Sequence, residues 1–273
     1  VYEDASVNLE WTNELKSECD KNNIDFFTSP YSLELVDHVD PYVQAYKIGS
    51  GDITWKEIID HISKKNKPVI MATGASTAKE VDMAISWLKK NNNKMAVLQC
   101  NTNYTGNNEN FKFINLNYLK QLRLKYKDLI IGLSDHTPGD ITVLGAVALG
   151  AKIIEKHFTD SNEREGPDHG FSLNPIAWKK MVDRTRLLEL SMGSVIKKVE
   201  QNEKETVLIQ RRSIWSNKNI KKGDKISIKK DLICLRPYVK GSITPSEINK
   251  INGKRAKVNI KNGQSISWKM IKK

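Results

Sequence analysis

The sequence contains few cysteines, and they form no recognisable pair. Cys19, Cys100 and Cys234 are odd in number and lie far apart in the 273-residue chain. This spacing excludes a disulfide framework and a CxxC metal site, and it is typical of a protein in a reducing compartment. We therefore expect a cytoplasmic protein.

Long hydrophobic runs are also missing. No apolar stretch approaches the roughly 18–20 residues that a membrane-spanning helix requires, so we expect a soluble chain without a membrane partner. No secretory signal is visible. The sequence begins at Val1 rather than at a methionine, and we expect its natural N-terminus to lie upstream.

Basic residues are in excess, and the formal net charge is +12. The lysines read as scattered, with pairs such as Lys64-Lys65 and Lys221-Lys222 at expected helix ends or turns. A nucleic-acid site needs clustered basic residues interleaved with aromatic residues, so we expect no nucleic-acid partner. Most of these lysines are interpreted as solvated surface, with a contribution from a basic active-site mouth for an anionic substrate.

Short apolar runs alternate with helical patterns through most of the chain. This alternation predicts an α/β fold with a parallel sheet whose strands are buried on both faces. Six strand–helix units do not close a (β/α)8 TIM barrel, which has eight. We therefore infer that the first two units of the barrel are absent from this sequence. The expected strands are residues 24–28, 45–49, 68–71, 95–100, 129–133 and 152–156.

The character of the sequence changes near Gly193. We predict an N-terminally incomplete barrel domain over residues 1–194 and a charged linker over residues 195–210. Short β runs and turn signals predict a small, mostly β domain over residues 211–273.

Two histidines stand at neighbouring strand ends. His136 follows the run Gly132–Asp135, and His157 follows Ile153–Lys156. In a parallel barrel these ends open on the face that carries chemistry, and two imidazoles there can share one divalent metal. The alternative from the pattern alone is a pair of ordinary surface or core histidines. Carboxylates nearby are Asp135, Glu155 and Asp168.

Other strand ends carry candidate binding residues. Lys47 is followed by small residues, a pattern suited to a carboxylate or phosphate. Each candidate also has a plain structural interpretation, such as a surface lysine, a helix start, a packed loop aromatic or an ordinary turn aspartate. The remaining candidates are Ser29, Ser50, Thr73, Thr102, Tyr104, Ser134 and Asp168.

Several runs together resemble the sialic acid synthase family, also called the nonulosonic acid synthases. The runs are AYKIGSGD (45–52), KPVIMATG (67–74), GLSDHT (132–137) and IEKHFT (154–159), followed by GPDH (166–169). RRSIWSNKNIKKGD (211–224) resembles the C-terminal antifreeze-like (SAF) domain of the same enzymes. The resemblance implies a TIM barrel joined to an SAF domain. It also implies a transferase that condenses phosphoenolpyruvate with an N-acetyl hexosamine and releases phosphate.

The resemblance also implies roles for single residues. His136 and His157 correspond to the ligands of a divalent metal, usually Mn²⁺, with Mg²⁺ or Co²⁺ as alternatives. Arg236 matches an arginine that reaches the partner's active site in a domain-swapped homodimer. The phosphoenolpyruvate contacts correspond to Lys47, Ser50, Ser134 and Ser29, and the sugar contacts to Tyr104, Thr102 and Asp168.

Three departures from the family pattern qualify these expectations. Ala72 replaces a serine that contacts phosphate in some members, and Thr102 replaces an asparagine that contacts the sugar. The segment with a catalytic glutamate and a second phosphate-binding lysine is not in this sequence. The acceptor therefore stays open between N-acetylmannosamine and two 2,4-diacetamido hexoses, and a non-catalytic sugar-binding or scaffold protein is the alternative.

Overall fold

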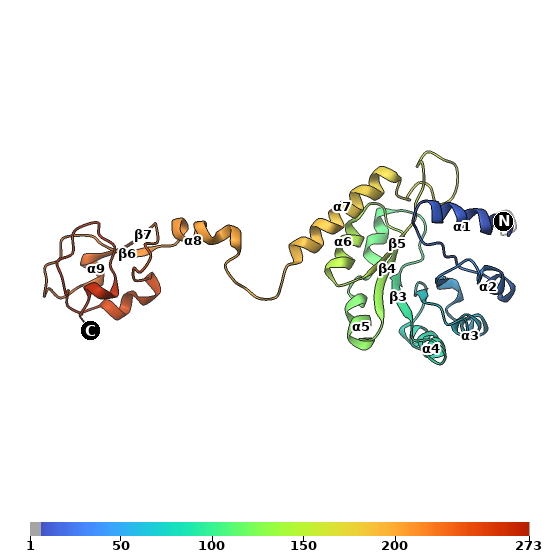
Figure 1. Cartoon of the computed structure of the whole chain (residues 1–273), viewed down its shortest axis with the longest axis horizontal. Coiled ribbons are helices and arrows are strands. Elements are labelled where there is room, and N and C mark those ends of the chain that lie inside the picture. Colours follow the sequence, from blue (N-terminus) through green and yellow to red (C-terminus); the bar gives the residue numbers. More distant parts are fainter. Residues whose placement is uncertain (1–6, 273) are drawn as a thin grey trace. The chain divides into compact units, whose positions relative to one another are not determined.

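The structure, a computed structural model, describes residues 7–272. The chain forms two compact units, one ending at Gly193 and the other beginning at Ser194 (Figure 1). Each unit has its own hydrophobic core. The predicted linker and the predicted small domain both fall in the second unit.

A parallel five-stranded sheet runs through the first unit, with its strands in sequence order. Isolated parallel bridges extend it from Thr28 to Tyr46 at one edge and from Phe158 to Leu173 at the other. The predicted α/β architecture with a parallel sheet is confirmed, as an open sheet within the described residues. The strands are β1 (Tyr46–Ile48), β2 (Val69–Ala72), β3 (Met95–Cys100), β4 (Ile130–Asp135) and β5 (Ile153–Lys156).

The segment predicted as the first strand, residues 24–28, is not a strand. Only Thr28 pairs, and its carbonyl accepts a hydrogen bond from the backbone N–H of Lys47 (3.1 Å). Ile24 and Phe27 remain 60% and 41% exposed. Because these side chains enter no interior, the burial that would favour a longer strand is missing. The other predicted strands agree with the structure to within two residues at each end.

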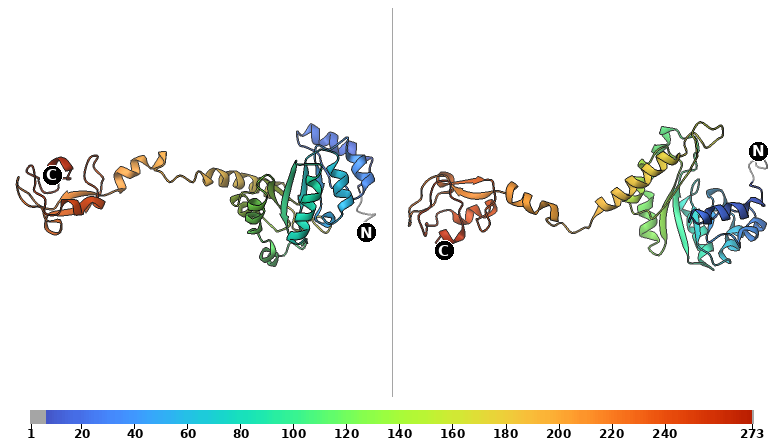
Figure 2. Two further views of the ribbon diagram at one scale, coloured as in Figure 1. Left: turned by 90° about the horizontal axis from the view of Figure 1, so that it is seen from below. Right: turned by 45° about the horizontal axis from the view of Figure 1, so that its top comes forward.

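Helices α2 to α6 supply the side chains that pack against one face of the sheet. Ser32 caps α2, because its Oγ accepts from the N–H of Leu35 (3.1 Å). Helices α6 and α7 lie side by side (Figures 1 and 2). No helix between residues 7 and 272 is both long and apolar enough to cross a membrane. The helices are α1 (Trp11–Lys21), α2 (Leu33–Val39), α3 (Lys56–Ser63), α4 (Ala78–Lys89), α5 (Tyr118–Lys125), α6 (Ile141–Ala148) and α7 (Pro175–Met192).

The two faces of the sheet differ in chemistry. Successive strand residues point to opposite faces, so each strand contributes to both. Tyr46 and Leu133 face the helices and belong to the apolar core. Their neighbours Lys47 and Ser134 lie on the other face, together with Glu155 of β5. The polar side chains of this second face form the candidate site.

The second unit is small and rich in turns. Strands β6 (Ser213–Ser216) and β7 (Leu232–Leu235) pair antiparallel, and isolated antiparallel bridges supply the rest of the β pairing. The predicted turns are present, since Gly223 (φ +91°) and Gly263 (φ +73°) adopt the left-handed conformation that favours glycine. Helices α8 (Lys204–Gln210) and α9 (Ile228–Asp231) complete the unit, with 3-10 helices at Pro245–Ile251 and Trp268–Met270.

Positive charge is concentrated in this second unit. Residues 211–273 contain 18 Lys and Arg but only 3 Asp and Glu, whereas residues 1–210 contain 26 and 29. The interpretation of the lysines as scattered was therefore wrong, because the whole net charge resides in the last quarter of the chain. A unit of this composition attracts anions over a range set by ionic strength.

The capping box of α4 provides a test of the fold. Oγ1 of Thr77 accepts from the N–H of Glu80, whose carboxylate accepts from the N–H of Thr77 (2.7 Å). Thr77→Ala removes the hydrogen bond that the threonine side chain accepts from Glu80. It should lower the unfolding free energy of the first unit by about 1 kcal/mol. Urea denaturation measures the change, with Lys79→Ala on the same helix as the control. An unchanged midpoint for Thr77→Ala would contradict the assignment.

Candidate active site

Most of the predicted site residues lie along one edge of the sheet, the edge formed by the carboxyl ends of its strands. Because all five strands are parallel, their carboxyl ends meet there. Residues at or just beyond these ends are Lys47, Ser50, Thr73, Thr102, Tyr104, Ser134, His136 and His157.

The two histidines lie next to each other. The ring centroids of His136 and His157 are 5.1 Å apart, with the planes at 65°. Tyr104 packs against both, at 4.3 Å from His136 and 5.7 Å from His157. Phe171 lies 5.1 Å from His157 and closes that side. Tyr104 is thus placed at the imidazole pair, as expected for a residue of the same site.

Each imidazole is held through its Nδ1 atom. Nδ1 of His136 lies 2.8 Å from the carbonyl oxygen of Asn101, and Nδ1 of His157 lies 3.3 Å from Oδ2 of Asp168. A carbonyl oxygen can only accept, so Nδ1 of His136 carries a proton and the neutral ring keeps its lone pair on Nε2. Burial lowers the pKa of His136 below its ordinary value, which favours the neutral form needed for ligation.

This donor set fits a divalent metal held by two nitrogen atoms. Metal-bound histidines commonly donate their other N–H to a carbonyl or carboxylate, as His136 does to Asn101, and the carboxylate of Asp168 lies 3.3 Å from Nδ1 of His157. Among residues 7–272, no group of three or more His, Cys, Asp or Glu side chains is arranged for a metal.

Lys47 and Glu155 show how strongly the sheet curves. Nζ of Lys47 on β1 lies 3.3 Å from Oε2 of Glu155 on β5, although three strands separate them. In a flat sheet, four strand spacings of about 4.8 Å would separate these strands by about 19 Å. The two side chains cannot bridge that distance, so the sheet curls around this face. The Oγ of Ser134 donates to Oε1 of Glu155 (2.7 Å) and completes the cluster.

A close backbone approach brings Ser50 and Thr102 to this edge. A Cβ on Gly74 would lie 2.4 Å from Cγ2 of Thr102 and 2.9 Å from Oγ of Ser50, so only glycine fits. Oγ of Ser50 accepts from the N–H of Gly74 (2.9 Å). The hydroxyl of Thr73 instead donates to the carbonyl of Leu98 (2.9 Å), so its proton is engaged within the sheet.

A buried thiol lies beside the two serines. Burial raises the pKa of Cys100, while hydrogen bonds from the hydroxyls of Ser50 and Ser134 act in the opposite direction. The side chain of Lys47 is only 10% exposed. One ammonium and two hydroxyls therefore converge on the concave face, a donor set suited to phosphate or carboxylate oxygens.

Comparison with models of known protein families shows which family the chain belongs to. Residues 1–197 match the model of the NeuB family, and residues 211–272 match that of the SAF domain. The chain belongs to the NeuB family. The resemblance seen in the sequence motifs is thereby confirmed for both parts.

Characterised relatives of this NeuB-family chain make nonulosonic acids. It is 36% identical to an N,N'-diacetyllegionaminic acid synthase of Campylobacter jejuni, over 82% of this chain and 67% of that protein. It is 33% identical to a pseudaminic acid synthase of the same species, over 97% of this chain and 76% of that protein. An N-acetylneuraminic acid synthetase structure from Leptospira borgpetersenii superposes with a TM-score of 0.68 at 30% identity, covering 74% of this chain and 70% of that one.

Three predicted site residues of the NeuB-family chain lie beyond the strand ends described above. Ser29 follows Thr28, whose carbonyl pairs with Lys47, and it is half-buried beside β1. Asp168 contacts the ring of His157 and lies at the histidine pair. Arg236 belongs to the second unit, where its Nε donates to the carbonyl of Gln210 (2.6 Å). Its predicted role at a partner's site stays a prediction.

Three residues at the site have no role predicted from the sequence: Glu155, Asn101 and Phe171. The sequence indicates Glu155 only as a carboxylate near the histidines, yet it contacts Lys47 and Ser134. Its place two residues before His157, on the same strand face, is the signal that could have identified it. No local pattern indicates that the carbonyl of Asn101 would meet His136 or that Phe171 would pack on His157.

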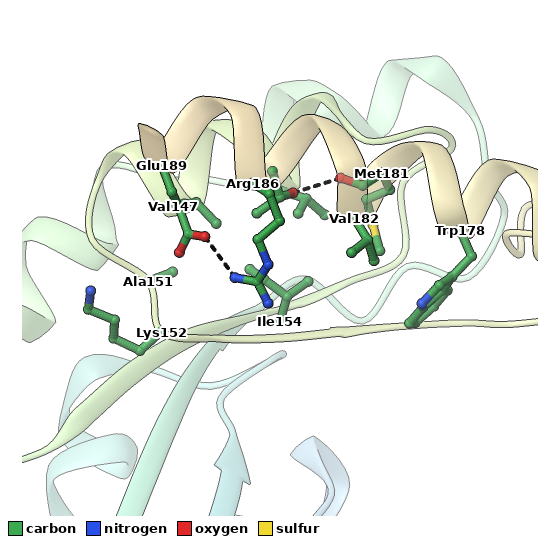
Figure 3. Close-up of a pocket in the computed structure, with 11 residues that line it drawn as sticks. Val147, Ala151, Lys152, Ile154, Trp178, Met181, Val182, Arg186 and Glu189 are labelled. Atoms are coloured by element: carbon green, nitrogen blue, oxygen red, sulfur yellow. Dashed lines mark hydrogen bonds and ion pairs between the residues drawn. The ribbon is translucent and has the colours of Figure 1, made fainter. Parts of the chain in front are cut away.

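A hollow lies on the helix-covered side of the sheet, between α6, β5 and α7. It has a volume of about 260 Å³ and is lined mainly by apolar residues such as Val147, Ile154 and Trp178. Figure 3 shows Arg186, paired with Glu189 at 2.7 Å, pointing from α7 toward the strand that carries Ile154. None of the predicted site residues lines this hollow, so it is separate from the candidate active site.

The lowered pKa of His136 leads to a direct test. In the metal-free protein, NMR titration of the histidine rings should give a midpoint for His136 below 6.5, because burial disfavours its charged form. Protonation competes with metal ligation, so metal affinity should be level above the lowered midpoint of His136 and decrease as the pH falls through it. A midpoint at or above 6.5 would contradict the buried, neutral imidazole. His157→Ala serves as the control for assigning the two resonances.

Proposed function

We propose that this protein is a nonulosonic acid synthase that condenses phosphoenolpyruvate with an N-acetyl hexosamine. The proposal rests on one observation, the meeting of Lys47 and Ser134 with the paired imidazoles of His136 and His157 at one sheet edge. An anion-binding group beside a metal-binding group is what the reaction requires. Membership of the NeuB family and the activities of its relatives support the same conclusion.

The anionic substrate would bind to the concave face. The ammonium of Lys47 and the hydroxyl of Ser50 would hold phosphate and carboxylate oxygens through charge-assisted hydrogen bonds, and the hydroxyl of Ser134 would join them by exchanging its hydrogen bond to Glu155 for one to the substrate. Glu155 orients both Lys47 and Ser134 before substrate arrives. Because these donors are already fixed, much of the catalytic gain comes from positioning and from stabilising developing charge. Ser29 and Thr73 would complete this side of the pocket.

His136 and His157 would hold the divalent metal, most favourably Mn²⁺, with Mg²⁺ or Co²⁺ as alternatives. When bound, such a metal supplies Lewis-acid polarisation of the aldehyde of the open-chain sugar. The chain's own contribution is to orient the imidazoles, through the carbonyl of Asn101 for His136 and through the nearby carboxylate of Asp168 for His157.

The reaction forms one carbon–carbon bond and expels phosphate. The methylene carbon of phosphoenolpyruvate attacks the aldehyde carbon, and positive charge develops at the carbon that bears the phosphate oxygen. Water adds there, and the carbon–oxygen bond to phosphate breaks, so the products are a nine-carbon keto acid and inorganic phosphate. Lys47 neutralises part of the negative charge on the departing phosphate.

The acceptor sugar would lie on the side of Tyr104, Thr102 and Asp168. Tyr104 offers an aromatic face and a hydroxyl, and Asp168 is exposed enough to accept from sugar hydroxyls as well as from His157. Ala72 offers no hydroxyl to phosphate, so the serine contact that the family resemblance implies for some members would be lost or replaced here. We also propose a domain-swapped homodimer in which Arg236 of one protomer reaches the sugar in its partner.

The activity test is phosphate release from phosphoenolpyruvate by the complete gene product. It is measured with Mn²⁺ and, in turn, N-acetylmannosamine and the 2,4-diacetamido hexoses that lead to legionaminic and pseudaminic acid. We expect release with one sugar only, which identifies the acceptor. No release with any of them from a folded, Mn²⁺-loaded protein would favour the non-catalytic sugar-binding or scaffold alternative.

Lys47→Met tests the anion site separately. The loss of a charge-assisted hydrogen bond of about 1.5–3 kcal/mol should raise KM for phosphoenolpyruvate by about 10- to 100-fold. The matched control is Lys56→Met on α3, which removes an exposed lysine paired with Asp60 and should leave KM unchanged. An unaltered KM in Lys47→Met would remove this residue from the site.

A further inference from the structure

A buried ion pair lies directly behind the two histidines. Nζ of Lys156 is 2.6 Å from Oδ2 of Asp135, and these side chains are 1% and 0% exposed. Asp135 ends β4, Lys156 ends β5, and the two are cross-strand partners. Each immediately precedes one of the candidate metal ligands, His136 and His157. Strand alternation therefore directs the ion pair to the helix-covered face and the imidazoles to the other.

The network around Asp135 is fully engaged. Oγ1 of Thr142 on α6 donates to Oδ2 (2.7 Å), and Oγ1 of Thr137 donates to Oδ1 (2.9 Å). The N–H of Thr137 also donates to Oδ1 (3.2 Å). A buried carboxylate with this many donors and a paired ammonium is held in one orientation. The end of β4 is thereby fixed to α6 as well as to β5.

Lys156 forms hydrogen bonds to the residues on both sides of His136. Its ammonium donates to the carboxylate of Asp135 and also to the backbone carbonyl of Thr137. The regular ladder between β4 and β5 ends at the pair Asp135–Lys156, so the histidines lie just beyond it. A side chain that precedes one histidine therefore anchors the backbone before and after the other.

We propose that Asp135 and Lys156 are positioning residues that set the separation of His136 and His157 for a shared metal. This inference rests on the proposed metal site. A buried ion pair usually adds little stability over well-packed apolar residues of similar size. The hydrogen bonds of the ion pair are directional, so they fix how the ends of the two strands are oriented. An apolar pair would fill the same space but would not fix this orientation.

The test replaces both charges together, in the double variant Asp135→Asn/Lys156→Met. Replacing one partner alone would leave an uncompensated buried charge and is expected to unfold the site. The first readout is the NOE between the rings of His136 and His157 in the metal-free, histidine-labelled full chain, which has five histidines. We expect the NOE in the wild type and its loss in the folded double variant.

The second readout is the dissociation constant for Mn²⁺, from the EPR signal of the free ion. We expect binding about 10- to 100-fold weaker in the double variant, the range found when groups that orient metal ligands are removed. The control is Lys89→Met/Asp128→Asn, which removes an exposed ion pair of the same 2.6 Å length away from the site. This control should retain both the NOE and the wild-type affinity.

Two outcomes separate the positioning role from the metal site itself. A folded double variant that keeps the ring–ring NOE and binds Mn²⁺ within twofold of the wild type overturns the inference. Wild-type protein that shows the NOE but binds no Mn²⁺ overturns the proposed metal site, while the NOE comparison still decides the positioning role. If the double variant does not fold, Thr142→Val removes one donor to Asp135, and an unchanged NOE and affinity there overturn the inference.

Discussion

Lys47 and Glu155 stand on the two edge strands of a five-stranded sheet, and their 3.3 Å contact requires the sheet to curl. The same curvature makes one face concave, so that side chains from separate strands converge instead of pointing in parallel. Parallel strands twist in a fixed sense, and helices packed against one face favour a curl around the other. The candidate site is a consequence of this curvature.

The division of the sheet into two faces explains how polar residues are tolerated at its end. Because strand residues alternate between the two faces, the helices pack against an apolar surface. Lys47, Ser134 and Glu155 lie on the other face, where Glu155 pairs with Lys47 and accepts a hydrogen bond from Ser134. A lysine that is largely buried needs such a partner. At the carboxyl ends of β4 and β5 the pattern changes, because Asp135 and Lys156 place an ion pair on the helix side as well. Polar groups on both faces there hold the backbone that carries the histidines.

The second unit differs from the first in both structure and charge. Its core consists mostly of isoleucines contributed by short segments, and much of its β pairing is by single bridges. Such a unit relies on turns with defined backbone conformation, as at Gly223 and Gly263. Residues 211–273 carry an excess of 15 positive charges, and none of the Lys and Arg residues among 211–272 is buried. For an enzyme whose proposed substrate is anionic, that charge favours encounter more than fold stability.

Much of the local structure could be predicted from the sequence. The alternation of apolar strands and helical periods determined the α/β architecture and most strand ends. The positions of His136, His157 and Lys47 at strand ends followed from the same periodicity. Local patterns were misleading at residues 24–28, where an apolar run lacks the burial that a strand needs.

Only the tertiary structure decided which of these residues meet. The contact of Lys47 with Glu155 depends on sheet curvature, and the orientation of His136 depends on a carbonyl 35 positions away. The pairing of Asp135 with Lys156 depends on strand register. Sequence periodicity specifies which way a side chain points along its own element. The distances between elements are set by packing and hydrogen bonding across the whole unit, which no local pattern encodes.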